Sequence, residues 1–254
     1  MHLLKSKYKI VKINNNKKET KNDFVVIEFP LKIFVNDIEF LTLLCSPEKL
    51  EYLVIGNLYS NMLISHIREI KSIKINMVDG IADVKLKKDV DLGNRFKDRI
   101  VYSTCGSFYK TLKLKKLKNN LRIDKDRILR LMRNLQESSK LFMETGCVHS
   151  SGLASKDKIL FLSEDIGRHN TIDKIIGYSL VEGINNRGDK IILTTGRLTS
   201  EMILKSSRAR FPVVVSKSAP TNMAIELAEH LNVTLIGFAR GKRLNVYTNK
   251  GLVF

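Results

Sequence analysis

The sequence predicts an α/β protein (α+β over its full length) in which a helix-covered sheet follows a smaller, mostly antiparallel β region. From residue 146 onward, apolar segments alternate with amphipathic ones in the order expected of strands and helices. Before residue 97, paired apolar segments flank Asn36-Asp37 and Asp79-Gly80, which are both typical of hairpin turns. We therefore expect four parts: a basic tail (1–22), a β-rich domain (23–97), a cysteine-bearing loop with a basic segment (98–122) and an α/β domain (123–254).

In the first half, the polar and lysine-rich residues 1–22 predict a loop or a frayed tail. Strands are expected at 24–29, on both sides of Asn36-Asp37 within 32–44, and on both sides of Asp79-Gly80 within 72–86. Between these pairs, Ser46-Pro47-Glu48 combines a capping residue, a proline and an acid, which predicts a helix running to about Met62.

In the second half, Asp124 is expected to cap a helix whose apolar residues Ile128, Leu131, Met132 and Leu135 share one buried face. Beyond it, strands and helices alternate as in a sheet covered by helices. The expected strands are 158–164, 189–196, 211–218, 232–238 and 244–248, and the expected helices are 171–183, 199–210 and 221–231.

The composition narrows the class of protein. Apolar residues make up 43% of the 254, which is typical of a soluble globular protein, and no apolar run approaches the roughly 18–20 residues that span a bilayer. No secretory signal is evident, so we expect a cytoplasmic protein without a membrane segment. The formal net charge of +18 favours anionic partners. Nucleic acid is disfavoured as the partner, because no reader motif is present and aromatic residues are not interleaved with the basic runs.

Cations cluster where the predicted strands of the second half end. The strand ends carry the phrases SEDIGRHN, TTGRLTS, SKSAPTN and GFARGKR. In α/β sheets such ends form the ligand-binding edge, and the helix starts beside them favour anions. The sequence therefore predicts a phosphate- or pyrophosphate-bearing ligand, although no P-loop or G-x-G-x-x-G motif is present. The cations in question are Arg168, Arg197, Lys217, Arg240, Lys242 and Arg243.

The three cysteines suggest different roles. Cys45 ends an apolar segment and is expected to be a packed core thiol. Cys147 lies two residues before His149, a pair that could bind zinc, but the spacing is not a standard one and we expect no metal. Cys105 lies among small polar residues ahead of a lysine run, so it is either a reactive thiol, favoured as thiolate by the lysines, or part of a solvated surface loop.

Two acids and a histidine in SEDIGRHN allow a second interpretation. Glu164, Asp165 and His169 could take part in acid–base chemistry. Asp165 could equally cap the following helix, and His169 could bind a phosphate or a base. We favour binding over proton transfer.

The phrases SEDIGRHNTIDKIIG, TTGRLTSEMILKS, VSKSAPTNMAIELAE and TLIGFARGKRLNVYT resemble, in order and spacing, the FdhD family of formate dehydrogenase accessory sulfurtransferases. The resemblance is dense over 143–248 and weaker over 24–105. It implies a C-terminal core with the α/β/α fold of cytidine deaminases but without their zinc site, a homodimer, and no resident metal. It also implies that sulfur arrives from a cysteine desulfurase as a persulfide and passes to the bis-molybdopterin guanine dinucleotide cofactor, with molybdenum or tungsten, for formate dehydrogenase.

The resemblance assigns roles to individual residues. The family's C-G-x-C loop falls on Cys105, the expected sulfur carrier, but its second cysteine is Phe108 here. A glycine of the family's T-G-G-x-H phrase is Cys147, which leaves open whether Cys147 replaces the missing thiol. The implied cofactor-binding residues are Phe238, Ala239, Arg240, Gly241, Lys242 and Arg243, with Arg168, His169 and Arg197 as further candidates. A rival hypothesis is a chaperone that inserts the cofactor without transferring sulfur.

Overall fold

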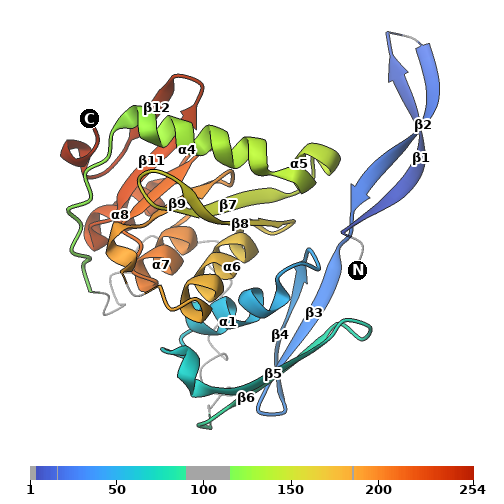
Figure 1. The fold of residues 1–254 in the computed structure, drawn as a ribbon, viewed down its shortest axis with the longest axis horizontal. Coiled ribbons are helices and arrows are strands. Elements are labelled where there is room, and N and C mark those ends of the chain that lie inside the picture. Colours follow the sequence, from blue (N-terminus) through green and yellow to red (C-terminus); the bar gives the residue numbers. More distant parts are fainter. Residues whose placement is uncertain (1–3, 16, 90–114, 185) are drawn as a thin grey trace.

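A computed structural model describes residues 4–15, 17–89, 115–184 and 186–254. Cys105 and Phe108 lie outside the described residues, so their predicted roles stay predictions. The described chain forms a six-stranded sheet, a four-stranded sheet and a long two-stranded hairpin (Figure 1). None of the described helices is long and apolar enough to span a lipid bilayer.

The six-stranded sheet is the centre of the C-terminal half, with the strand order β12-β11-β10-β9-β7-β8. The three strands β9, β10 and β11 are parallel, and β12 is antiparallel to β11. Strand β7 is antiparallel to both of its neighbours, β8 and β9, so β8 points in the same direction as β9. The strands are β7 (His149–Ala154), β8 (Ile159–Asp165), β9 (Ile191–Thr194), β10 (Val213–Ser216), β11 (Thr234–Arg240) and β12 (Arg243–Val246).

Helices cover both faces of this sheet, as the alternating pattern predicts. One face is covered by helix α4 (Lys125–Ser138), which packs against strand residues such as Val213 through Ile128, Leu131, Met132 and Leu135. Asp124 caps the start of this helix, because its carboxylate accepts from the backbone N–H groups of Asp126 and Arg127. The other face carries α6 (Arg168–Val181), α7 (Ser200–Arg208) and α8 (Asn222–Leu231) (Figure 1). The predicted α/β class is confirmed.

The N-terminal half adds a second sheet and one helix. The sheet has the order β4-β3-β6-β5, in which β3 and β6 are parallel and the other pairs antiparallel. Both predicted hairpin turns are present, since Asn36 and Asp37 have φ of 49° and 67° and Gly80 has φ of 65°. The elements are β3 (Phe29–Val35), β4 (Ile38–Cys45), α1 (Leu50–Ser60), β5 (Ile70–Asn76) and β6 (Ile81–Leu86).

The two halves meet where α1 crosses α6, and two glycines set their separation. A Cβ atom on Gly56 would lie 1.7 Å from the carbonyl oxygen of Asp173, and one on Gly177 would lie 1.9 Å from that of Tyr52. The helices can approach this closely only because neither residue has a side chain. One apolar core runs continuously from the four-stranded sheet through α1 to α6, so the proposed domain boundaries stay predictions.

Residues 1–22 are not the loop that their polarity predicts. Over the described residues they form β1 (Lys5–Asn14) and much of β2 (Lys17–Val26), an antiparallel hairpin that extends away from the body (Figure 1). The lysines obscured an alternation in which Tyr8 and Ile10 share one face and Val11 and Ile13 the other. Asn15 enters the turn with φ of 45°, a conformation that asparagine tolerates.

Three further expectations need correction. Helix α1 begins at Leu50, with Lys49 before it, rather than at Pro47 after a cap at Ser46; the Ser46 backbone N–H instead donates to Asp165, as described below. Helix α6 begins at Arg168, ahead of the predicted residue 171. Strand β7 and the short helix α5 (Lys140–Thr145) were not predicted, because serines and glycine break the apolar pattern of β7 and α5 spans only six residues.

Candidate functional site

The strand ends that carry the predicted cations lie on one edge of the six-stranded sheet. Because β8, β9, β10 and β11 point the same way, their carboxyl ends meet there. The antiparallel β7 and β12 begin at the same edge, since His149 pairs with Asp165 and Arg243 pairs with Arg240. The sheet thus brings Cys147 and His149 beside the cations of the other strand ends.

A cavity of about 690 Å³ opens at this edge. Three cations line it, Arg197, Lys217 and Arg240, and among its described lining residues none is acidic. Such an arrangement favours an anion, because no carboxylate among the described lining residues offsets the positive charge. The lining residues are Gln136, Ser139, Phe142, Gly146, Cys147, Val148, His149, Ser150, Ile166, Thr195, Arg197, Lys217, Ser218, Ala219, Phe238 and Arg240.

Phe238 reaches the cavity through an irregularity in β11. The pairing of β11 with β12 shifts register between Gly237 and Arg240, and Phe238 has φ of 52°. Bulges of this kind redirect a side chain, and a phenylalanine in the left-handed region is energetically costly. The Phe238 backbone N–H donates to the Ser218 carbonyl at 3.1 Å, and the Arg240 guanidinium lies 6.0 Å from the Phe238 ring. An aromatic ring beside a guanidinium suits a flat, anionic ligand.

The other residues of the predicted cofactor segment lie around the cavity rather than in its wall. Ala239 is fully buried behind it, whereas Gly241, Lys242 and Arg243 are exposed at the turn between β11 and β12. Their predicted contacts with the ligand stay predictions.

Two further candidates come from the start of α6. Arg168 lies against Gly196, on which a Cβ atom would come 3.0 Å from the Arg168 Cβ, and Gly196 sits between two lining residues. His169 instead faces α7, where its Nδ1 lies 3.5 Å from Oε1 of Glu201. Neither residue is among those that line the cavity.

His149 is the titratable imidazole of the cavity wall. Burial lowers its pKa, and the positive charges of Arg168 and Arg197 lower it further. The imidazole is therefore neutral at neutral pH, and its environment disfavours protonation until an anion arrives.

The three cysteines have different environments. Cys45 is the packed core thiol that its position predicts, and burial, followed by the charge of Asp165, raises its pKa to about 12. Cys147 is exposed, follows the left-handed Gly146 that ends α5, and lines the cavity. No group of three or more metal-ligating side chains occurs within the described residues. Sequence reasoning could not place Cys147 at this cavity, because β7 was not predicted.

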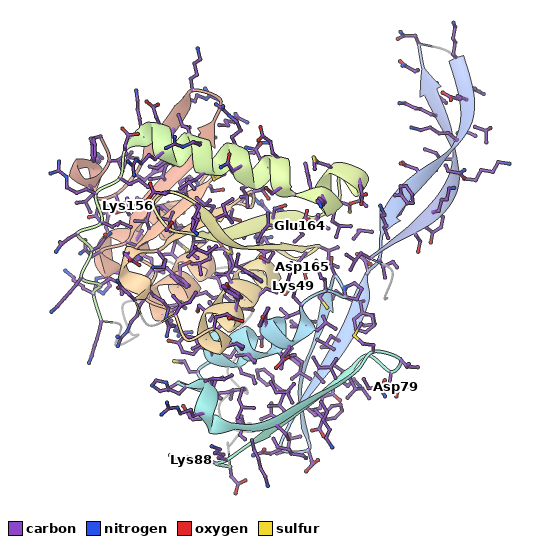
Figure 2. All side chains as sticks on the ribbon, in the orientation of Figure 1. Lys49, Asp79, Lys88, Lys156, Glu164 and Asp165 are labelled. Atoms are coloured by element: carbon purple, nitrogen blue, oxygen red, sulfur yellow. The ribbon has the colours of Figure 1, made fainter. Side chains whose placement is uncertain are left out.

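The acidic residues of SEDIGRHNTIDK do not face the cavity as free carboxylates. Asp165 and Lys174 form an ion pair of 2.6 Å in which both side chains are fully buried. The Asp165 carboxylate also accepts from the Ser46 backbone N–H at 3.1 Å and from Asn170 Nδ2 at 2.8 Å, and Lys174 donates to the Ser46 carbonyl at 3.3 Å. This network ties α6 to the segment ahead of α1, and Figure 2 labels Asp165 at the end of β8.

A second buried pair lies along the same junction. The Nζ of Lys205 lies 2.7 Å from Asp173, whose carboxylate also accepts from Ser60 Oγ at 2.6 Å and Asn57 Nδ2 at 3.2 Å. Ser60 and Asn57 belong to α1, so the pair joins α1 to α6 and α7. We refer to the Asp165–Lys174 and Asp173–Lys205 pairs as the buried seam.

Glu164, near the carboxyl end of β8, also uses its carboxylate for a structural contact. Its carboxylate accepts from the backbone N–H groups of Leu141 and Phe142 at 3.0 and 2.9 Å, which are free donors at the start of α5. It therefore holds the helix that leads into Gly146 and Cys147.

The model of the FdhD/NarQ family matches residues 26–253. The chain belongs to the FdhD/NarQ family. Among its relatives in the family, "Sulfur carrier protein FdhD" of Bacillus pumilus is 44% identical over 236 residues, which cover 90% of each chain. The protein of the same name from Bacillus licheniformis is 42% identical over 248 residues, covering 95% of this chain and 94% of the relative.

A solved family structure agrees with the fold. It is the crystal structure of a protein described as a formate dehydrogenase accessory protein from Desulfotalea psychrophila, with a TM-score of 0.82 and 27% identity. The match covers 99% of this chain and 100% of that one. The resemblance to the FdhD family inferred from the sequence phrases is confirmed.

Proposed function

We propose that this FdhD-family chain is a sulfur carrier that supports the maturation of formate dehydrogenase. The observation that carries the proposal is the cavity at the strand ends, where Arg197, Lys217 and Arg240 meet without an opposing carboxylate. A guanine dinucleotide cofactor brings several phosphate charges, which this cavity would hold by charge-assisted hydrogen bonds. The names of the relatives, sulfur carrier proteins, support the transfer of sulfur.

The volume of the cavity suggests how much of the cofactor it holds. Pockets of about 300–1,000 Å³ enclose one small-molecule group. A cavity of about 690 Å³ therefore suits one nucleotide-sized portion of bis-molybdopterin guanine dinucleotide, with the remainder outside. The Phe238 ring and Arg240 would flank the base and the phosphates, and Lys242 and Arg243 at the exposed turn would meet charges beyond the rim.

Sulfur would travel on Cys105. Its thiolate attacks the outer sulfur of a persulfide on a cysteine desulfurase, the donor S–S bond breaks, and the donor cysteine leaves as thiolate. Cys105 then carries the persulfide. Release of the outer sulfur at the level of sulfide returns Cys105 to a thiol and takes up two electrons, which two external thiols supply as they are oxidised to one disulfide.

The test is the intact mass of the protein after incubation with a cysteine desulfurase and cysteine. We expect the gain of one sulfur atom in the wild type and no gain in Cys105→Ala. A wild-type protein that gains sulfur on another residue, or none at all, would contradict the role of Cys105. Undiminished formate dehydrogenase maturation in Cys105→Ala cells would instead favour a cofactor chaperone that does not transfer sulfur.

A further inference from the structure

A second cavity, of about 510 Å³, opens at the other edge of the six-stranded sheet. Its wall is built from the chain that leads into β9 and into β10, and from the segment 115–118. Because β9 and β10 are parallel, their amino ends lie together, and the length of the strands separates this cavity from the first one at their carboxyl ends. We call it the basic pocket.

Positive charge dominates the wall of the basic pocket, and no acidic residue is among its described lining residues. Like charges gathered in one place repel one another, and an anion bound between them would offset that repulsion. The end of α7 accounts for part of the charge, because carbonyl groups at a helix C-terminus attract cations and Arg208 lies in the last turn. It does not account for the lysines, which belong to an extended segment. The six cations are Lys115, Lys116, Lys118, Arg187, Arg208 and Arg210.

The backbone of the lysine segment is fixed in place. The Leu117 carbonyl accepts from Asn232 Nδ2, at the end of α8, over 2.9 Å. The buried Asn119 donates from Nδ2 to the Pro212 carbonyl at 2.9 Å, which ties the segment to the turn ahead of β10. The three lysines are exposed, while the backbone that carries them is held against the protein. A ligand of the pocket would therefore not have to order this backbone, which lowers the cost of binding.

Two arginines of the pocket are also positioned by the fold. Arg187 donates from Nε to the Ile184 carbonyl at 3.1 Å and from Nη1 to the Ala209 carbonyl at 3.4 Å, which orients its guanidinium. Arg210 follows α7 with φ of 64°, and its backbone N–H donates to the Ser207 carbonyl at 2.9 Å. Glycine is the usual residue at this position of a helix end, because it has no Cβ atom. An arginine there places a cation at the pocket at a cost in backbone energy.

We propose that the basic pocket binds a compact anion of the diphosphate class, either inorganic pyrophosphate or the diphosphate group of a nucleotide. Several cations in one concave site favour a ligand with more than one charge, and guanidinium and ammonium groups form charge-assisted hydrogen bonds with phosphate oxygens. The volume lies in the range of small-molecule sites, which favours such a ligand over a nucleic acid. No aromatic side chain is among the described lining residues, in contrast to Phe238 in the first cavity, so the pocket binds phosphates without selecting a base.

The test measures, by mass spectrometry, how fast N-hydroxysuccinimide acetate acetylates individual lysines of the full chain, with and without inorganic pyrophosphate at constant ionic strength. We expect saturating pyrophosphate to slow the acetylation of Lys115 and Lys118 about fivefold or more, because a bound anion favours the protonated, unreactive amine. Lys156, exposed between β7 and β8, is the internal control and should react at an unchanged rate. GDP and ADP distinguish the two sources: equal protection by both identifies a nucleotide diphosphate as a ligand, and protection by pyrophosphate alone identifies the inorganic ion.

The variant Lys116→Gln/Arg210→Gln removes two exposed cations of the pocket. Its matched control is Lys125→Gln/Arg130→Gln, two exposed positions on α4 with the same change in net charge. We expect the pocket variant to raise the pyrophosphate concentration for half protection about tenfold or more, and the control to raise it by less than about threefold. Arg240→Gln in the first cavity should leave protection unchanged. All of these variants should unfold at the urea concentration of the wild type, because the substituted side chains are exposed.

Unchanged acetylation of Lys115 and Lys118, or equal slowing at Lys156, would overturn the proposal. So would a control variant that shifts half protection as much as the pocket variant does, because net charge alone would then explain the effect. Loss of protection in Arg240→Gln would overturn it as well, since the anion would then act from the first cavity. Protection by a short single-stranded RNA where pyrophosphate gives none would assign the lysines to a nucleic-acid surface instead.

Discussion

The buried seam and the strand-end cavity both contain charged residues of the family phrases, yet they use charge in opposite ways. In the seam, Asp165 and Asp173 are each paired with a lysine and saturated by hydrogen bonds from the N-terminal half. In the cavity, Arg197, Lys217 and Arg240 face open space with no described carboxylate opposite. A charged residue in a conspicuous sequence motif can therefore be structural or ligand-binding, and only its contacts in the fold distinguish the two. Removing a seam charge should cost stability, whereas removing a cavity charge should cost binding.

The largest effect is expected at the seam. Lys174→Met leaves the Asp165 carboxylate buried without its cation, so we expect a loss of about 3–5 kcal/mol in the free energy of unfolding, measured by urea denaturation. The exposed Lys156→Met is the control and should change stability by no more than about 0.5 kcal/mol. Asp165→Asn in the Lys174→Met background removes the unpaired charge and should recover part of the loss. A loss below about 1 kcal/mol for Lys174→Met would show that the seam is not structural.

An intermediate effect is expected at the cavity. GDP resembles the nucleotide end of the cofactor, so its binding should slow the alkylation of Cys147, which lines the cavity. Arg240→Gln removes one charge-assisted hydrogen bond to the phosphates, so it should weaken GDP binding about tenfold without changing the free energy of unfolding. Lys242→Gln, exposed at the adjoining turn, should have a smaller effect on GDP binding. Cys45 is an internal control, since burial raises its pKa to about 12 and keeps it unreactive. Alkylation of Cys147 at the same rate with and without GDP would place the nucleotide elsewhere.

The smallest effect concerns pH. The pKa of His149 is lowered in the empty cavity by burial and by the charges of Arg168 and Arg197. A bound phosphate favours the imidazolium, so the ligand raises this pKa and binding takes up a proton. GDP affinity should therefore rise by about two- to fivefold as the pH falls from about 8 to about 6. The His149→Gln variant is the control, because the titration of the phosphate itself affects both proteins equally. If GDP affinity depends on pH in the same way in both proteins, His149 does not contribute to the site.

The elements with strong local signals were predictable. The turns at Asn36-Asp37 and Asp79-Gly80 and the cap at Asp124 are where the sequence predicts them, and α7 and α8 begin within one residue of their predicted starts. The cations at the strand ends were predictable as a group, because parallel strands bring their carboxyl ends to one edge. The β1–β2 hairpin was not predictable, since seven lysines in its two strands hid an alternation that only cross-strand pairing makes visible.

Residue identity and local period were therefore enough to predict the α/β class and the family, and they are the basis for expecting an anionic ligand. Tertiary packing alone decided which charged residues were available to bind it. The insertion of β7 between β8 and β9 brings Cys147 and His149 to the cavity, and the crossing of α1 on α6 takes Asp165 and Asp173 into the interior. Asp165 and Ser46 lie far apart in the chain, and no local pattern encodes a contact that depends on how two sheets and two helices pack.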